Sequence, residues 1–234
     1  LYVHPAETGR GLADIKNEVQ GVVDLELQVT GWRAAPMEIG SLDSAPWEQG
    51  GNALAASWKA LDLLRNGAFD GVAMNVGILQ GGDRPGAVAD RATTRFRLKF
   101  SGKHSWRELL QAGNRQLESI VAQHATDTGR YTLSLQVAGY RTNPGRADWE
   151  SPYSRVLRES IADITGQAPG AYPNHYAGDI RFPIRLLQAP AYGIGSLGGN
   201  FYGPNEWVDV DDLLNLVAVI VRTVSGWSAA QQAG

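Results

Sequence analysis

The sequence predicts an α/β fold with a self-contained α+β unit in the middle of the chain. Two observations predict it. Over residues 21–140 the hydrophobic pattern changes period in the order strand, helix, strand, strand, helix, strand. After a break at residues 143–146 (Asn-Pro-Gly-Arg), the pattern is again α/β but too short for a complete sheet domain. The chain therefore has one complete unit and part of another.

The first half of the middle unit is one strand and one helix. Apolar and polar residues alternate over residues 21–31, as in a half-buried strand. Residues 32–51 hold prolines and glycines and are predicted as a loop. Asn52 is a candidate cap for a helix that ends near Arg65 and carries an apolar stripe.

The second half repeats the order with one more strand. Strands are predicted over residues 72–79 and 93–100, with glycine-rich turns between them. Ser105 is a candidate cap for a long helix that ends near Gln123, and residues 131–137 alternate as a last strand. This order is that of the ferredoxin-like βαββαβ arrangement, a two-layer unit.

We expect three segments, over residues 1–18, 19–142 and 143–234. Tyr2 and Val3 are typical of the end of a buried strand, and His4-Pro5 of the turn that follows it. Because the chain enters in mid-strand, we expect it to be the C-terminal part of a longer protein.

The last segment carries two predicted helices. One covers residues 152–164, and the other starts near Val208 and continues the apolar period to Val224. Residues 170–192 are predicted as a polar loop that leads into a short strand at residues 191–194. A glycine-rich loop over residues 193–203 precedes the final helix, which is a common way to build a site for an anion or a polar substrate.

Composition excludes several functions. The 234 residues carry a net charge of -3 with no dense Lys/Arg stripe, which argues against a nucleic-acid partner. No apolar run approaches the ~20 residues of a membrane span, so we expect no membrane partner. The absence of cysteine excludes disulfides and cysteine-based metal sites, and it fits a reducing compartment, so we expect a cytoplasmic protein.

Two of the four histidines are candidates for chemistry. His4 follows a buried strand, and strand ends in α/β domains are where ligands gather. His175 lies in a polar segment close to the charged residues Asp179 and Arg181. The Asp179/Arg181 pair is either a local ion pair or a means to bind a substrate carboxylate through the arginine. His104 and His124 are expected to face solvent.

Several motifs together resemble one family. The chain is similar to the C-terminal two-thirds of the zinc amidohydrolases that include acetylornithine deacetylase, succinyl-diaminopimelate desuccinylase, glutamate carboxypeptidases and aminoacylase. The matching residues are His4-Pro-Ala-Glu-Thr-Gly9, Gly50-Gly-Asn-Ala53, Asn75-Val-Gly-Ile-Leu-Gln-Gly-Gly82, Val88-Ala-Asp90, Gly178-Asp-Ile-Arg-Phe182, Gly193-Ile-Gly195 and Pro204-Asn-Glu-Trp-Val208.

The resemblance implies a fold and an activity. The middle unit would be a lid and dimerisation domain, and the rest would be the C-terminal part of an α/β zinc-peptidase catalytic domain. Two zinc ions would act on the amide bond of an N-acyl amino acid or small peptide-like substrate with a free carboxylate. The missing N-terminal half would supply the general base and most metal ligands, and a homodimer would form through the lid.

The resemblance also assigns residues. His4 and Tyr202 fall at metal-ligand positions, and Tyr202 replaces the histidine of the family. Arg181 falls where the family holds the substrate carboxylate. The candidate substrate-binding residues are Arg181, Asp179, Gly193, Gly195, Asn200 and Asn205.

Three departures from the family leave an alternative open. Besides Tyr202, no histidine stands near residues 34–36 and no asparagine near residues 84–86, where the family's lid has them. These substitutions favour a non-catalytic dimerising or binding module derived from the family. The polar residues kept at Asp179, Arg181 and Glu206 favour the enzyme.

Overall fold

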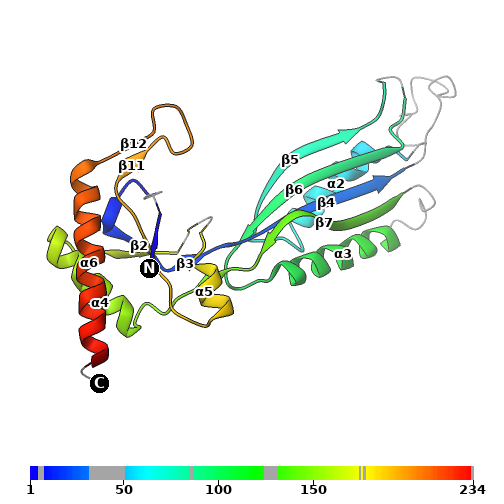
Figure 1. Ribbon diagram of the computed structural model, residues 1–234. Coiled ribbons are helices and arrows are strands. Elements are labelled where there is room, and N and C mark those ends of the chain that lie inside the picture. The colour runs from blue at the N-terminus through cyan, green and yellow to red at the C-terminus, as the bar shows by residue number, and fades with distance from the viewer. Residues whose placement is uncertain are drawn as a thin grey trace. The chain divides into compact units, whose positions relative to one another are not determined.

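The chain forms two compact units, as the computed structural model in Figure 1 shows. One unit is Gly21–Asn143, and the other combines Leu1–Gln20 with Pro144–Gly234. The structure describes residues 1–4, 8–31, 51–84, 87–123, 131–173, 175 and 178–232. Pro5, residues 32–50 of the predicted loop, Pro85, Gly86 and His124 lie outside the described residues.

The unit Gly21–Asn143 is a four-stranded antiparallel sheet with two helices. Its elements follow the chain as β4 (Gly21–Thr30), α2 (Ala53–Arg65), β5 (Ala73–Gly81), β6 (Arg91–Phe100), α3 (Trp106–Gln123) and β7 (Thr132–Thr142). The strand order in the sheet is β5-β6-β4-β7. The pairing of β4 with β6 runs without a break from Gly21 opposite Phe100 to Thr30 opposite Arg91.

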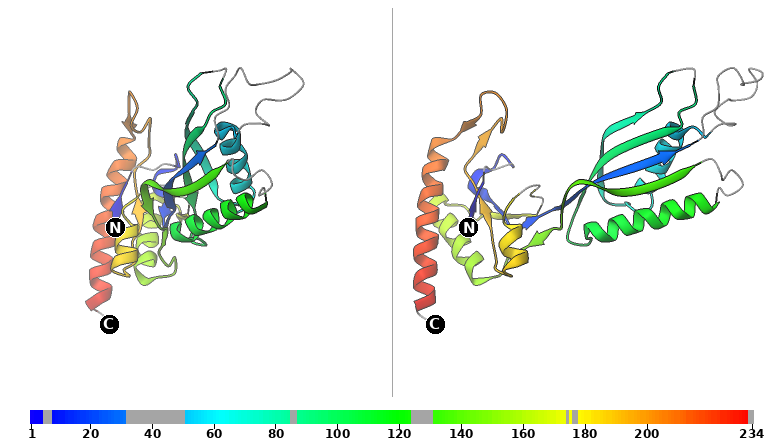
Figure 2. Two further views of the ribbon diagram at one scale, coloured as in Figure 1. Left: turned by 90° about the vertical axis from the view of Figure 1, so that its right-hand side faces the viewer. Right: turned by 45° about the vertical axis from the view of Figure 1, so that its right-hand side comes forward.

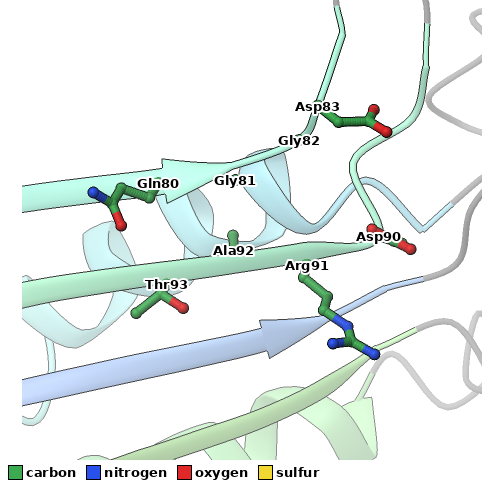
Figure 3. Close-up of a pocket in the computed structure, with 8 residues that line it drawn as sticks. All are labelled: Gln80, Gly81, Gly82, Asp83, Asp90, Arg91, Ala92 and Thr93. Carbon is green, nitrogen blue, oxygen red and sulfur yellow. The ribbon is translucent and has the colours of Figure 1, made fainter.

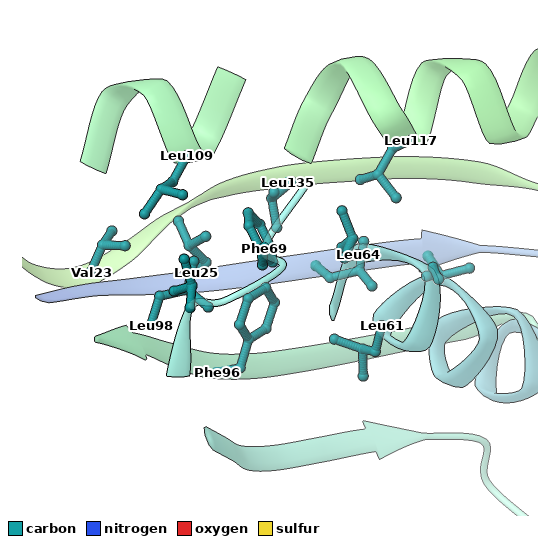
Figure 4. Packing of buried hydrophobic residues seen from close by; sticks show 14 of the residues in the cluster. Val23, Leu25, Leu61, Leu64, Phe69, Phe96, Leu98, Leu109, Leu117 and Leu135 are labelled. Atoms are coloured by element: carbon teal, nitrogen blue, oxygen red, sulfur yellow. The ribbon is translucent and has the colours of Figure 1, made fainter. Parts of the chain in front are cut away.

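One face of this sheet forms the core of the unit. Alternate residues of β4, which are Val23, Leu25, Leu27 and Val29, are at most 1% exposed. Both helices pack on this face (Figure 2). Figure 4 shows Leu61 and Leu64 of α2 and Leu109 and Leu117 of α3 directed at the strands. The strand period of two and the helix period of 3.6 thus place their apolar residues in one layer.

The other face of the sheet carries paired charges. Arg97 donates from Nε and Nη2 to the two carboxylate oxygens of Asp24, at 2.6 and 2.8 Å. Arg95 Nε donates to Glu26 Oε2 at 2.6 Å. These bonds hold the pKa of each carboxyl below its usual value, through Arg97 for Asp24 and through Gln28 and then Arg95 for Glu26.

Both predicted helix caps of this unit are confirmed. Asn52 Oδ1 accepts from the backbone N–H groups of Leu54 and Ala55. Ser105 Oγ accepts from Glu108 N, while Glu108 Oε2 accepts from Ser105 N, which is a capping box. The caps fix where α2 and α3 begin.

The other unit has a small mixed sheet of very short strands in the order β1-β10-β2-β9. The strands are β1 (Tyr2–Val3), β2 (Asp14–Lys16), β9 (Gly170–Tyr172) and β10 (Gly193–Ile194). β1 is parallel to β10, β10 is antiparallel to β2, and β2 is parallel to β9. A short helix, η1 (Gly11–Ala13), precedes β2.

Two long helices, α4 (Pro152–Thr165) and α6 (Val210–Gln232), complete this core. Leu157 and Ile161 of α4 pack with Leu216 and Val219 of α6 in one buried cluster. Ser151 caps α4 with a bond from Ser154 N, and Gly166 ends it in the left-handed region at φ 72°. The sequence predicted both helices.

The prediction of a polar loop at residues 170–192 is wrong. The strand β9 and the helix α5 (Arg181–Leu186) lie there. Four further strands of two residues each were not predicted: β3 (Glu18–Val19) pairs with β8 (Gly145–Arg146), and β11 (Gly198–Gly199) pairs with β12 (Trp207–Val208). Elements this short carry no readable period.

The final helix differs from expectation in one respect. The sequence showed no run long enough for a membrane span, but α6 is long and apolar enough to cross a membrane by length and composition. Asp211 and Asp212 stand in its first turn and Arg222 near its middle, with an apolar stretch between them. A core helix of a globular domain passes the same test, so this is weak evidence for a membrane span.

Candidate functional site

The centre of the candidate site is His4, which is held at the end of β1. Its backbone N–H donates to Ile194 O at 2.9 Å and extends the pairing of β1 with β10. Its ring stacks on Tyr2, with the centroids 5.7 Å apart. The strand end therefore fixes the ring, as the sequence predicted from its position before a turn.

Lys16 is a neighbour of His4 that sequence reasoning missed. Lys16 ends β2 and is 2% exposed. Its Nζ lies 2.9 Å from His4 Nδ1 and donates to His4 O at 3.4 Å. Because a lysine ammonium only donates, Nδ1 of the ring accepts, and the ring carries its proton on Nε2. The sequence around it, Asp14-Ile-Lys-Asn-Glu18, is mostly polar and gave no signal that Lys16 is buried.

His175 comes from far along the chain to the same place. Its ring centroid is 5.0 Å from that of His4 in an edge-to-face arrangement, and the residue is fully buried. Its carbonyl accepts from Gln20 N at 2.9 Å. A Cβ at Gly178 would lie 2.0 Å from His175 Nε2, so only glycine fits there. The two candidate histidines thus lie in one group.

Arg181 is a buried cation at the start of α5. It is 3% exposed, and its Nε donates to Gly178 O at 2.9 Å. Within the described part of the chain, its Nη1 is buried without a hydrogen-bond partner. The described ion pairs include none between Arg181 and Asp179, which is exposed. The guanidinium is therefore not neutralised by its neighbour in sequence.

The glycine-rich loop (residues 193–203) lies close to the group of His4, Lys16 and His175 at its first residue, Gly193. A Cβ on Gly193 would lie 3.2 Å from the Lys16 side chain, so a glycine lets β10 run close to Lys16. Gly195 is buried, whereas Asn200 and Asn205 are exposed and joined by a bond from Asn200 Nδ2 to Asn205 O at 3.3 Å.

Tyr202 stands apart from His4. It is 96% exposed, with φ at 62° in the left-handed region. Among the described residues, no group of three or more histidine, aspartate or glutamate side chains could hold a metal ion. Zinc sites need three or four ligands, and one nitrogen of His4 already faces the Lys16 ammonium. The described residues therefore do not form a zinc site by themselves.

Two shallow pockets lie outside this group. One, of about 240 Å³, is lined by Ser196, Gly198, Phe201, Glu206, Trp207 and Val208. The other, of about 300 Å³, lies in the unit Gly21–Asn143 where β5 and β6 meet, and Figure 3 shows its lining of Gln80–Asp83 and Asp90–Thr93. Neither contains a histidine, but the first is formed by the predicted glycine-rich loop (residues 193–203) and the residues that follow it.

Comparison with known proteins gives consistent results. Residues 35–226 match the family described as peptidase family M20/M25/M40. The chain is 28% identical over 139 residues to succinyl-diaminopimelate desuccinylase of Maricaulis maris (strain MCS10). The aligned region covers 58% of this chain and 33% of that protein.

Solved structures share the fold. A tripeptidase from Staphylococcus aureus matches with a TM-score of 0.70 and 13% identity, over 91% of this chain and 53% of its own. An amidase of the hydantoinase/carbamoylase family from Burkholderia phymatum matches with a TM-score of 0.67 and 15% identity, over 98% of this chain and 55% of that protein's chain. The chain thus spans about half the length of these structures and about a third of the curated relative.

Proposed function

Because this chain belongs to peptidase family M20/M25/M40, we propose that it is part of a metal-dependent amidohydrolase or peptidase. Its substrate would be an N-acyl amino acid or a small peptide-like molecule with a free carboxylate. The catalytic domain would be completed by an N-terminal half that supplies the general base. This agrees with the matched structures, of which the chain covers 53–55%.

The observation that carries this proposal is that Arg181 is buried with one guanidinium nitrogen unpaired among the described residues. Burying a cation is costly unless an anion or several hydrogen bonds compensate it. Arg181 is 3% exposed, yet its Nη1 has no partner in the described part of the chain. A substrate carboxylate would fit a guanidinium with a free nitrogen. Gly193, Gly195, Asp179, Asn200 and Asn205 are the other residues proposed to line the substrate site.

The metal requirement is part of the same proposal. Zinc, if bound, supplies a Lewis acid for the scissile carbonyl. Of the described residues, His4 and Tyr202 are the ligands proposed from this chain, and Tyr202 is 96% exposed. The remaining ligands would have to come from the N-terminal half. For His4 to bind the metal, a ring nitrogen must present a lone pair, so the bond from Lys16 to Nδ1 would have to give way to the metal while Nε2 keeps its proton.

The unit Gly21–Asn143 is proposed as a ferredoxin-like lid through which two chains form a homodimer. Its strand order β5-β6-β4-β7 leaves β5 at one edge of the sheet. An edge strand presents unpaired backbone groups that can pair with a second chain. The proposal of a non-catalytic module shares this dimer but predicts no turnover.

The test uses the complete polypeptide, which is this chain joined to its N-terminal half or mixed with it. Hydrolysis of N-acetyl and N-succinyl amino acids and of a tripeptide is measured beside zinc content. Arg181→Gln should lower kcat/KM by about 10–100-fold on these substrates, the value of a charged hydrogen bond of about 1.5–3 kcal/mol. It should matter little for substrates whose carboxylate is amidated.

Arg185→Gln is the matched control, because Arg185 lies on the same helix but is exposed. Equal losses for the two variants would contradict the role of Arg181. A complete polypeptide without zinc and without turnover on any of these substrates would contradict the enzyme and leave the binding module.

A further inference from the structure

The helix α6 is apolar on two sides, and the structure covers only one of them. Leu216, Val219 and Thr223 are buried against the rest of the unit, next to α4. A second row of apolar residues is exposed. This outer stripe consists of Val210, Leu214, Val217, Val221 and Val224, which are 54–64% exposed.

Helix geometry separates the two sides. At about 100° per residue, the outer stripe falls within roughly 80° of the helix circumference, and its centre lies roughly 140° from the buried side. Leu213 and Ile220 fall between the two sides. The apolar arc is therefore roughly 220° wide, about twice the stripe of an ordinary surface helix. Helices that are apolar over so wide an arc are typically buried on more than one side.

The spacing of the outer stripe indicates what covers it. Its residues follow one another at intervals of four, three, four and three. This is the repeat that packs one helix along another at a small crossing angle. Trp207 and Val208, immediately before the helix, are also exposed and continue the apolar surface.

Three kinds of surface could cover the outer stripe: a second copy of this chain, a membrane, or a further part of the same domain. The area of the stripe and the contacts of α6 distinguish them. Fifteen residues at ~1.5 Å and a width of ~10 Å give on the order of 200 Å². A stable dimer buries about 800 Å² on each partner, so a second copy on this stripe alone is too small. The buried core that α6 shares with α4 favours a helix that belongs to this domain over a membrane span, and the exposed pair of Arg222 with Asp163 adds little to this.

A segment that belongs to the same domain does not need to bury ~800 Å² on this stripe alone, because it is also held by contacts with the rest of the domain. The matched structures extend well beyond the region aligned with this chain, which covers 53–55% of them. We infer that an apolar-faced helix of the N-terminal half lies along the outer stripe of α6. This inference rests on the proposed function, because it requires the N-terminal half that is proposed there.

The chain has no cysteine, so single cysteines can report which surfaces are covered. Val217→Cys lies in the outer stripe, and Ala229→Cys is an exposed control on the polar side of the same helix. Both are labelled with a maleimide in the 234-residue chain alone and in the complete polypeptide. The inference predicts that labelling of Val217→Cys slows at least ~10-fold in the complete polypeptide, whereas labelling of Ala229→Cys does not change.

Each other outcome overturns the inference. Equal labelling of Val217→Cys in both preparations means that the N-terminal half does not cover the stripe. Protection in the chain alone that grows with its concentration identifies a second copy. Protection only with phosphatidylglycerol and phosphatidylcholine vesicles identifies a membrane. Hydrolysis of N-acyl amino acids is measured on the same complete polypeptide, so that failure of this inference can be told from failure of the proposed function. Turnover without protection of Val217→Cys overturns only this inference. Protection without turnover overturns only the proposed function.

Discussion

The two units of this chain differ in how completely they bury their apolar residues. In Gly21–Asn143, strands of 9 to 11 residues and two helices enclose one core. Among the described residues of this unit, the exposed large hydrophobic ones are Trp58, Ile78, Leu79 and Tyr140. The other unit leaves α5, β12 and much of α6 apolar and exposed. The described residues of the first unit thus enclose their apolar side chains, whereas the second unit presents an exposed apolar surface of the kind that marks a contact site.

The largest effect that tests this comparison is a pair of leucine truncations. Leu64 of α2 is fully buried, and Leu214 of α6 is 63% exposed. Leu64→Ala should cost about 2–5 kcal/mol because it leaves a cavity. Leu214→Ala should change the stability of the chain alone by less than about 0.5 kcal/mol. Urea unfolding, with hydrogen exchange to assign each transition to its unit, measures both. A large loss for Leu214→Ala would show that the stripe is already covered.

The same contrast explains which elements the sequence could predict. In the unit Gly21–Asn143, long segments repeat one period several times, so all six elements were found, with bounds shifted by a few residues. β7, for example, continues to Thr142 beyond the predicted residue 137. In the other unit, strands of two or three residues gain their partners only through tertiary pairing. Their positions cannot be read from a local pattern.

The candidate site shows the same limit. Sequence reasoning singled out His4 and His175 separately, but it could not predict that a fold brings their rings to 5.0 Å. It missed Lys16, because a lysine in a mostly polar stretch such as Asp14–Glu18 usually reaches solvent. The roles of Arg181, Gly193 and the asparagines remain predictions, since they depend on a ligand and on residues outside the described chain.

A second prediction concerns acid and the charged face of the sheet. Gln28, Arg95 and Gln136 bond the Glu26 carboxylate and lower its pKa. A carboxyl with a lowered folded-state pKa stabilises the fold above its unfolded pKa of about 4.3, and this contribution is lost as pH falls through the lowered value. The unit Gly21–Asn143 should therefore lose stability below about pH 4.

Glu26→Gln separates this effect from general acid unfolding. At pH 7 it should cost about 1.5–3 kcal/mol, since the bond from Arg95 to a charge is lost. Its stability should then depend less on pH between 5 and 2. Glu118→Gln, on an exposed site of α3, is the control and should leave the pH profile unchanged. Urea unfolding across this pH range measures the profiles, and parallel curves for Glu26→Gln and the parent chain would contradict the assignment.

The smallest effect tests whether α2 depends on its own cap as well as on packing. Asn52 accepts two backbone N–H bonds at 3.1 and 3.2 Å, so Asn52→Ala should cost about 1 kcal/mol. Asn52→Ser keeps an acceptor at the same place and should cost only a few tenths. Hydrogen exchange at Leu54 and Ala55 reports the cap directly, because these are the two amides it bonds. Equal exchange in both variants would mean that the core under α2, rather than its cap, determines where the helix begins.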